Sequence, residues 1–240
     1  MWRTATLVAT RDETPDARTL VLEVPGWPGH LGGQHVDVRL TADNGYQATR
    51  SYSLAAPPDH DRVEVTVQRV LDGEVSPYLT DGLRPGDAVE VRGPAGGWFV
   101  WRPDDPGGVL LVAGGSGIVP LMAMIRARRA AGSAAPFRLI YSVRTPDDRY
   151  YAAELDQLAD EADGPELAYA YTRSAPADAT RPAARIGAAD LPPPGWSPDG
   201  DETCFVCGPT GFVEAASALL VSLGYDPRRI KTERFGPSGQ

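Results

Sequence analysis

The stretch Val109–Pro120 reads VLLVAGGSGIVP and organises the second half of the chain. An apolar run of strand length ends in a glycine cluster, and apolar residues then recur at helical spacing at Ile118, Leu121, Met122 and Ile125. This order predicts a strand, a glycine turn and a helix. Such a turn lets the backbone approach a pyrophosphate, whose charge suits the N-terminus of the helix. The alternative is a tight strand-to-helix connection without a ligand.

Strand-like and helix-like segments alternate from this stretch to the end of the chain. Apolar runs predict strands over residues 109–113, 137–143, 166–172, 203–206 and 229–233. Helical periodicity predicts helices over residues 118–131, 149–162 and 211–223. A loop rich in proline and alanine, residues 174–201, interrupts the alternation. The pattern is typical of an α/β domain with a parallel sheet.

The first hundred residues show short alternating runs between turn-forming clusters. We expect about six strands, five of which are predicted by runs over residues 5–9, 18–24, 35–40, 62–70 and 88–92, and one short helix near residues 76–80. Such a series predicts an antiparallel six-stranded barrel, so the fold class is α/β plus β. A polar segment with turn residues, 102–108, follows. We therefore expect a barrel domain over residues 1–101 and a parallel α/β domain over residues 102–240.

The composition of the 240 residues is that of a globular protein, with 42% hydrophobic and 23% charged residues. Twenty-three basic and thirty-two acidic residues give a net charge of −9, which argues against nucleic-acid and anionic-membrane binding. No apolar run approaches the roughly 20 residues of a membrane span, and the N-terminal segment lacks the apolar core of a signal peptide. We therefore expect a cytoplasmic, monomeric protein.

Two cysteines, Cys204 and Cys207, form one C-x-x-C pattern inside an apolar run. A zinc or iron–sulfur site needs about four ligands, and the three histidines lie far from this run in the sequence. A buried strand is the favoured interpretation, and a dithiol or metal site is the alternative. We expect no metal site.

The segment Arg50-Ser51-Tyr52-Ser53 lies between strand-like runs of the first half. Alternate side chains of a strand share a face, so Arg50 and Tyr52 would lie on one side and Ser53 on the other. A flavin needs a cation for its phosphates, an aromatic ring against its ring system and a polar group at N5, and this segment offers all three. An ordinary strand with an exposed arginine is the alternative.

Five motifs, in order along the chain, resemble those of the ferredoxin–NADP reductase superfamily, in which an FAD-binding barrel precedes an NAD(P)-binding domain. The motifs are R-x-Y-S at residues 50–53, G-x-x-S at 73–76, G-P-x-G at 93–96, G-G-[ST]-G-[IV]-x-P at 114–120 and C-G-P at 207–209. The resemblance covers nearly the whole chain and implies the fold described above.

The resemblance implies an FAD site on the barrel. The expected FAD contacts are Arg50, Ser51, Tyr52, Ser53, Gly73, Val75 and Ser76. Arg50 would neutralise the FAD phosphates with the help of Ser76 and the neighbouring backbone. Tyr52 would pack on the flavin ring, and Ser53 would form a hydrogen bond near N5, where hydride arrives.

The resemblance also implies a nicotinamide cofactor on the second domain. Its expected contacts include Gly114, Gly115, Ser116 and Gly117 at the pyrophosphate, and Cys207, Gly208 and Pro209 at the edge of the nicotinamide site. Glu233 has the position of a carboxylate that such reductases carry near the C-terminus, and Phe235 that of an aromatic residue stacked on the flavin. Residues 236–240 and a phenylalanine in place of tyrosine depart from the family, so plain packing of Phe235 is the alternative. Ser53, Cys207 and Glu233 are the expected catalytic residues.

Charge after the second and third strands of the α/β half indicates which nicotinamide cofactor is used. An NAD site places a carboxylate there for the ribose, whereas an NADP site uses arginine for the 2′-phosphate. Arg144 follows the second strand, with Asp147 and Asp148 slightly later. The pair Thr172-Arg173 after the third strand resembles the Ser-Arg pair of NADP-using relatives, with Arg185 downstream. We therefore expect NADPH in preference to NADH.

The resemblance implies an enzyme that moves hydride from NADPH to FAD and passes electrons one at a time to a separate acceptor. Relatives often carry an iron–sulfur domain with four clustered cysteines, which this sequence lacks. We therefore expect the acceptor to be another protein, a ferredoxin or an oxygenase component. The alternatives are a flavin or small-molecule diaphorase and a flavin electron-transfer subunit that does not turn over nicotinamide.

Overall fold

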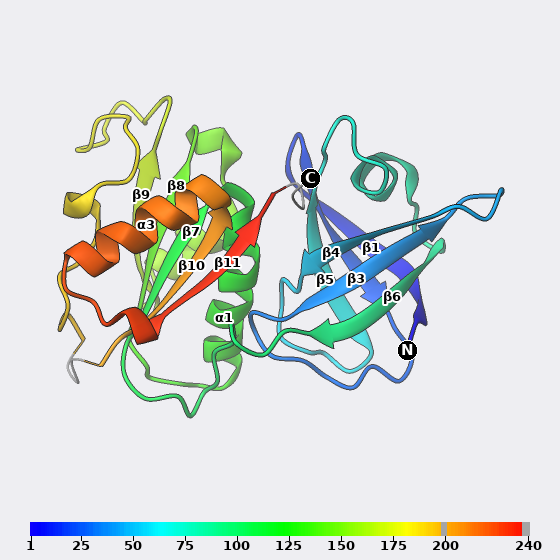
Figure 1. Ribbon diagram of the computed structural model, residues 1–240, viewed down its shortest axis with the longest axis horizontal. Helices are drawn as coiled ribbons and strands as arrows, with labels where there is room; N and C mark the ends of the chain where they lie inside the picture. Colours follow the sequence, from blue (N-terminus) through cyan, green and yellow to red (C-terminus); the bar gives the residue numbers. More distant parts are fainter. Residues whose placement is uncertain (198–200, 237–240) are drawn as a thin grey trace.

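A computed structural model describes residues 1–197 and 201–236 of the chain. Two sheets lie side by side, an antiparallel one from the first half and a parallel one from the second (Figure 1). The first sheet contains β1 (Arg3–Thr14), β2 (Ala17–Glu23), β3 (His35–Thr41), β4 (Gln47–Ser53), β5 (Arg62–Gln68) and β6 (Ala88–Ala95). The second half contains β7 (Val109–Gly114), α1 (Ile118–Ala130), β8 (Phe137–Val143), α2 (Ala152–Ala159), β9 (Glu166–Tyr171), β10 (Thr203–Pro209), α3 (Thr210–Ser222) and β11 (Ile230–Phe235).

The six strands of the first half form the expected antiparallel barrel. Their order is β4-β3-β6-β1-β2-β5, and a bridge between Leu54 and Val65 joins the two end strands. The alternating pattern of β5 shows why the strands close around a core, because every second residue, Val63, Val65 and Val67, lies inside the barrel. The expected short helix is a single helical turn over Tyr78–Gly82.

The five strands of the second half form a parallel sheet of order β11-β10-β7-β8-β9. Helices α1 and α2 share one apolar core with one face of this sheet, and α3 shares another with the opposite face. Every residue of β7 is buried, which explains why its sequence is a continuous apolar run and does not alternate. The fold class expected from the sequence is confirmed.

Helix α1 lies between the parallel sheet and the barrel (Figure 1). Its residues from Ile118 to Ile125 are all buried, more than the four spaced apolar residues of the sequence pattern indicate. Ala17 and Ala55 of the barrel belong to the same apolar core as this helix. A Cβ atom added to Gly32 would lie 3.0 Å from the Cα atom of Met124, so the barrel backbone approaches α1 very closely.

Several boundaries differ from those expected. The helix expected over residues 149–162 begins only at Ala152, because Tyr151 has a left-handed backbone with φ of 56°, and it ends at Ala159. Strand β1 is longer than residues 5–9, and β10 and β11 continue to Pro209 and Phe235. The boundary between residues 101 and 102 stays a prediction.

Parts of two expected segments, residues 198–200 of the proline-rich loop and residues 237–240 of the tail, lie outside the described residues. Within the described ranges, no helix is long and apolar enough to cross a membrane.

Candidate active site

The glycine loop at the end of β7 packs directly against the end of β10. Gly115 has φ of 53°, a conformation that L side chains rarely adopt. A Cβ atom added to Gly117 would lie 2.1 Å from the carbonyl oxygen of Cys207, and one added to Gly208 would lie 3.0 Å from that of Gly114. The structure therefore brings together the two motifs that the sequence assigns to the nicotinamide cofactor. Only glycine permits this approach.

Cys207 and Glu233 are register partners on the neighbouring strands β10 and β11. Both strands are parallel, so their carboxyl ends meet at the sheet edge that also carries the glycine loop. Burial raises the pKa of Glu233 to about 7. Burial, and next the charge of Glu233, raise the pKa of the Cys207 thiol well above its usual value, so that thiol is neutral.

Ser53 ends β4 at the side of the barrel that faces α1. It is buried, and its Oγ atom has no hydrogen-bond partner among residues 1–197 and 201–236. Glu233 Oε2 is likewise buried and unpartnered within these ranges. Buried polar atoms are normally paired, so both atoms are suited to a bound group. Two residues after Ser53, the carbonyl of Ala55 accepts a hydrogen bond from Arg126 of α1.

Arg50 is exposed and forms an ion pair with Glu74, with 3.1 Å between Nη2 and Oε2. The Tyr46 hydroxyl donates to the same carboxylate over 2.7 Å. In the same turn, Ser76 Oγ accepts a hydrogen bond from the amide of Val70. The structure thus brings Arg50 to the G-x-x-S turn, as the resemblance implies. The Arg50 guanidinium is, however, paired with the carboxylate of Glu74 in that turn.

The remaining barrel residues of the expected site differ in accessibility. Tyr52 packs partly against the barrel core, and burial raises the pKa of its hydroxyl to about 12. Ser51 donates to Asp37 over 2.6 Å. The Val75 side chain is fully inside the barrel core, so only its backbone is available to a ligand.

The halves of the chain match two family models. Residues 4–100 match the model described as "Oxidoreductase FAD-binding domain", and residues 111–218 match "Oxidoreductase NAD-binding domain". A relative from an Amycolatopsis strain, described as "Aromatic O-demethylase, reductase subunit", is 33% identical over 98% of this chain and 70% of its own length. The chain belongs to the ferredoxin–NADP reductase superfamily. It is an oxidoreductase with FAD and NAD(P) as cofactors.

Other members of the superfamily agree with this assignment. The ferredoxin–NAD(P)(+) reductase component of the naphthalene 1,2-dioxygenase system from Pseudomonas putida is 28% identical over 98% of this chain and 69% of its own length. The crystal structure of an Amycolatopsis cytochrome P450 reductase superposes with a TM-score of 0.82 and 29% identity, covering 100% of this chain and 71% of the other.

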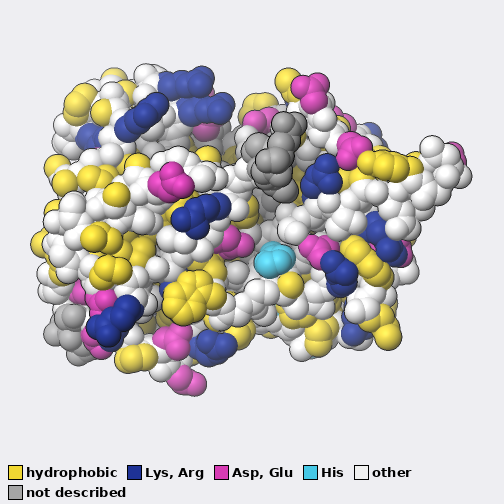
Figure 2. All heavy atoms as spheres, in the orientation of Figure 1, with side chains coloured by type: hydrophobic (Ala, Val, Ile, Leu, Met, Phe, Trp, Pro, Cys, Tyr) yellow, Lys and Arg dark blue, Asp and Glu magenta, His cyan; other side chains and the backbone are white. Residues whose placement is uncertain are grey.

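Arginines lie at the carboxyl ends of β8 and β9 in this superfamily member. The amide of Arg173 donates to the carbonyl of Arg144 over 2.9 Å, so the two residues are neighbours, and both side chains are exposed. Within the described part of the chain, Arg149 and Arg181 are held in ion pairs, whereas Arg144, Arg173 and Arg185 are not. Figure 2 shows basic side chains gathered along this edge of the domain.

The two cysteines do not form a pair. Cys204 belongs to the apolar core on the α3 face of the sheet, and Cys207 to the core on the α1 face. Residues three apart in a strand point to opposite faces, so a dithiol or a shared metal ligand set at this C-x-x-C is wrong. Phe235 is half-buried and packs against the core that contains Cys207, as the packing alternative states. Its stacking on a flavin stays a prediction.

Two features of the site were missed from the sequence. The first is Glu74. The sequence did contain a signal for it, because a negatively charged residue is unexpected inside a turn that should bind phosphate. The second is the contact of Ala55, just after Ser53, with Arg126. No local pattern indicates it, because the two residues lie 71 positions apart in the sequence.

Proposed function

We propose that the chain is an NADPH-dependent FAD reductase that passes electrons one at a time to a separate acceptor protein. The observation that supports this most directly is the pairing of Cys207 with Glu233 beside the glycine loop Gly114–Gly117. These residues lie at the carboxyl ends of parallel strands, where ligands bind in open α/β sheets.

Bound FAD supplies the hydride acceptor and can release electrons singly, which nicotinamide cannot do. Ser53 would donate a hydrogen bond from its buried hydroxyl toward flavin N5. Glu233, whose burial places its pKa at about 7, can hold or release a proton at Oε2 near neutral pH. Cys207 would present a neutral thiol at the edge of the nicotinamide.

On the barrel, Arg50 would hold the FAD phosphates together with the backbone of Gly73, Val75 and Ser76. This requires Arg50 to exchange the Glu74 carboxylate for a phosphate, which can accept bidentate hydrogen bonds from a guanidinium. Tyr52 would support the flavin ring. The contacts of Ser51 and Phe235 with FAD are part of the same proposal.

On the parallel-sheet domain, Gly114, Gly115, Ser116 and Gly117 would hold the pyrophosphate, and Gly208 and Pro209 would border the nicotinamide. Thr172, Arg144, Arg173 and Arg185 would bind the 2′-phosphate. Of the two carboxylates that follow the second strand, Asp148 accepts hydrogen bonds at Oδ2 from the Thr145 amide and hydroxyl, and Asp147 is exposed. The exposed side chains of Arg144 and Arg173 favour NADPH over NADH.

The relatives support a protein acceptor. The Amycolatopsis relative is described as a reductase subunit and the Pseudomonas relative as a reductase component of a dioxygenase system. We propose that a ferredoxin or an oxygenase component receives the electrons. A cytoplasmic location and a monomeric state stay predictions.

The test is a comparison of electron acceptors with the purified, FAD-loaded chain. NADPH should support reduction of ferricyanide and of an iron–sulfur protein from the same cell extract, with NADH at least about tenfold less efficient. Rapid reduction of free flavin with no reduction of any iron–sulfur protein would instead identify a diaphorase. An FAD-loaded chain that oxidises neither nicotinamide cofactor would leave only a non-turnover electron-transfer subunit.

A further inference from the structure

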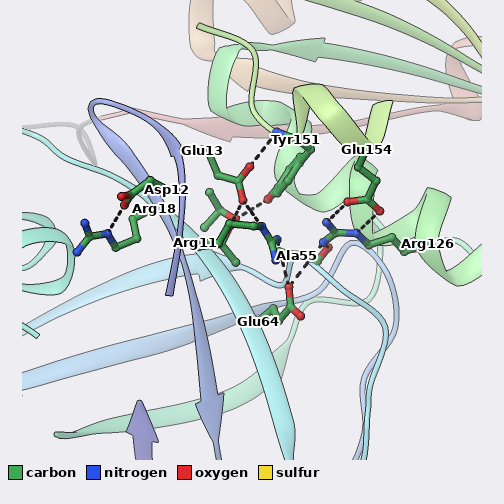
Figure 3. A network of polar contacts seen from close by, with 11 residues as sticks. Arg11, Asp12, Glu13, Arg18, Ala55, Glu64, Arg126, Tyr151 and Glu154 are labelled. Carbon is green, nitrogen blue, oxygen red and sulfur yellow. Dashed lines mark hydrogen bonds and ion pairs between the residues drawn. The ribbon is translucent and has the colours of Figure 1, made fainter. Parts of the chain in front are cut away.

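A polar seam joins the two domains on the side of α1 and α2 (Figure 3). We call it the domain seam and define it by Glu13, Ala55 and Thr66 of the barrel and Arg126 and Tyr151 of the parallel-sheet domain. Each of the two side chains of the parallel-sheet domain contacts the barrel by a direct hydrogen bond. The domain seam is thus built from groups that are far apart in the sequence.

Tyr151 is the centre of the domain seam. It is buried, and its left-handed backbone, φ 56°, is one that an L residue adopts only when its surroundings hold it there. Its amide donates to Glu13 Oε2 over 3.0 Å, and its hydroxyl shares a hydrogen bond of 2.5 Å with that of Thr66. Both partners belong to the barrel. The barrel therefore stabilises the backbone turn that precedes α2.

Arg126 contacts both sides of the domain seam. Its Nε and Nη2 atoms donate to the two carboxylate oxygens of Glu154 on α2, over 2.9 and 2.5 Å, and its Nη1 atom donates to the Ala55 carbonyl over 2.8 Å. The guanidinium also lies 4.8 Å from the centre of the Tyr151 ring. With its side chain only 14% exposed, this arginine is fixed by bonds in three directions.

The barrel side of the domain seam is directly connected to Ser53. Ala55 follows Ser53 by two residues, and its amide donates to the carbonyl of Glu64 over 2.8 Å. Leu54, between them, is bridged to Val65, the neighbour of Thr66. The contacts of Arg126 and Tyr151 therefore fall on the backbone that follows Ser53 and on the part of β5 that is bridged to it.

The other side of the domain seam is connected to the dinucleotide loops. Arg126 lies on α1, which begins immediately after the glycine loop Gly114–Gly117. Tyr151 lies on the segment between Arg144 and α2. Arg126 is joined by α1 to the glycine loop, and Tyr151 lies on the segment that follows Arg144, so both residues are connected to loops proposed to hold NADPH.

Interfaces between domains of one chain generally permit relative motion, whereas hydride transfer requires the reacting atoms about 3–3.5 Å apart and aligned. We propose that the domain seam is a positioning device for hydride transfer, with Tyr151 as its positioning residue. It holds the Ser53 end of the barrel and the Cys207–Glu233 edge of the parallel sheet in one fixed relation. This rests on the proposed function, since it assumes FAD on one domain and NADPH on the other.

The test compares FAD-loaded Tyr151→Phe and Thr66→Val, each of which removes one hydroxyl from the domain seam, with Tyr225→Phe. Tyr225 is the matched control, because its buried hydroxyl donates over 3.0 Å to the carbonyl of Pro192 inside one domain. Anaerobic stopped-flow mixing with NADPH gives the limiting rate of flavin reduction and the dissociation constant of NADPH separately. Hydrogen exchange of the peptides that contain Ala55 and Tyr151 reports on the domain seam without any turnover.

We expect Tyr151→Phe and Thr66→Val to lower the limiting rate about tenfold or more, with the dissociation constant of NADPH changed less than about twofold. Tyr151 and Thr66 share one hydrogen bond, so the double variant should be no slower than the slower single variant. Thr66→Val also removes the 2.7 Å hydrogen bond between Thr66 and Thr19 inside the barrel, so Tyr151→Phe is the more specific of the two variants. Exchange of the peptides containing Ala55 and Tyr151 should become faster. Tyr225→Phe should change neither the limiting rate nor the exchange.

Limiting rates within about twofold of the unmodified chain in both seam variants would overturn the proposal, as would an equal loss in Tyr225→Phe. If Tyr151→Phe does not fold, Thr66→Val carries the same comparison, and Thr66→Ser should restore the rate because it restores the hydroxyl. Failure of the proposed function is a separate result. In that case the unmodified FAD-loaded chain would itself not be reduced by NADPH.

Discussion

Cys207 and Glu233 lie opposite each other on β10 and β11, at the sheet edge where the glycine loop also ends. Burial raises the pKa of Glu233 to about 7, and it raises that of the Cys207 thiol well above its usual value. Near neutral pH the pair therefore consists of a neutral thiol beside a carboxyl group that is partly protonated. Burial of the Glu233 carboxyl group lowers stability when the group is ionised, and it gives the group a pKa suited to proton transfer near neutral pH.

The first prediction concerns the pH dependence of stability. Because folding raises the pKa of Glu233 from 4.5 to about 7, the folded chain binds this proton more tightly than the unfolded chain does. The contribution to the free energy of unfolding is therefore full below pH 4.5 and is lost as the pH rises through 7, by about 3 kcal/mol.

Glu233→Gln replaces the titrating carboxyl group with a neutral amide, so the free energy of unfolding no longer falls with pH at this position. The difference in free energy of unfolding between Glu233→Gln and the unmodified chain, measured in urea, should shift in favour of the variant by about 3 kcal/mol from pH 4.5 to pH 8. Glu214→Gln on the exposed side of α3 is the control and should follow the unmodified chain. A constant difference between Glu233→Gln and the unmodified chain at every pH would contradict the raised pKa of Glu233.

The second prediction concerns Ser53. Within the described residues its Oγ atom is buried without a partner, so Ser53→Ala removes a hydroxyl whose desolvation is uncompensated in the ligand-free chain. The free energy of unfolding of the ligand-free chain should stay within about 0.5 kcal/mol or rise. Flavin reduction by NADPH should slow about 10- to 100-fold, because a hydrogen bond to the reacting atom is lost.

Stopped-flow mixing of the FAD-loaded variant measures this rate. Ser53→Thr keeps the hydroxyl and should recover part of it. A normal rate in Ser53→Ala, combined with a large loss of stability, would show that Ser53 serves the barrel and not the reaction.

The third prediction concerns the ion pair between Arg50 and Glu74. Arg50→Ala should weaken FAD binding about 10- to 100-fold, since it removes charged hydrogen bonds to phosphate. Glu74→Gln should strengthen FAD binding a few-fold, because Arg50 no longer has to exchange a carboxylate for a phosphate. Quenching of FAD fluorescence on titration with the flavin-free protein measures both constants. Equal weakening in the two variants would mean that Glu74 supports the site and does not compete for Arg50.

The fourth prediction concerns Arg173 and the choice of cofactor. Arg173→Ala should raise the KM for NADPH by well over about tenfold and change the KM for NADH little, because only NADPH carries the 2′-phosphate. Arg228→Ala is the control, since it removes an exposed arginine that is paired with Asp226 in a distant turn. Steady-state rates with ferricyanide as electron acceptor give the KM for NADPH and the KM for NADH of each variant. An equal rise in the KM for NADPH and for NADH would show that Arg173 does not bind the 2′-phosphate.

Much of the fold follows from local patterns in the sequence. Alternation in the run around Val63, Val65 and Val67 predicts a strand with one face in the barrel core. The continuous apolar run before Gly114 predicts a strand that is buried on both faces. The opposite orientation of Cys204 and Cys207 also follows from strand geometry alone.

The contacts between the domains could not be predicted in this way. Helical periodicity after residue 149 gives no sign that Tyr151 leaves the helix, because the cause is its hydrogen bonds with Glu13 and Thr66 of the other domain. The continuous burial of α1 from Ile118 to Ile125 has a similar origin, since the barrel covers the face that a helix on the surface would leave exposed. Pairings over such sequence distances follow only from the assembled fold.

The most direct test of the proposed function is single-turnover reduction of the FAD-loaded chain under anaerobic conditions. We expect NADPH to bleach the flavin absorbance near 450 nm, a property of flavins in general, in a fast first phase. NADPH with deuterium at the transferred C4 position should slow this phase, because the bond from C4 to the transferred hydrogen is broken in it. A flavin that binds to the chain and stays oxidised in the presence of excess NADPH and NADH would contradict the proposed function.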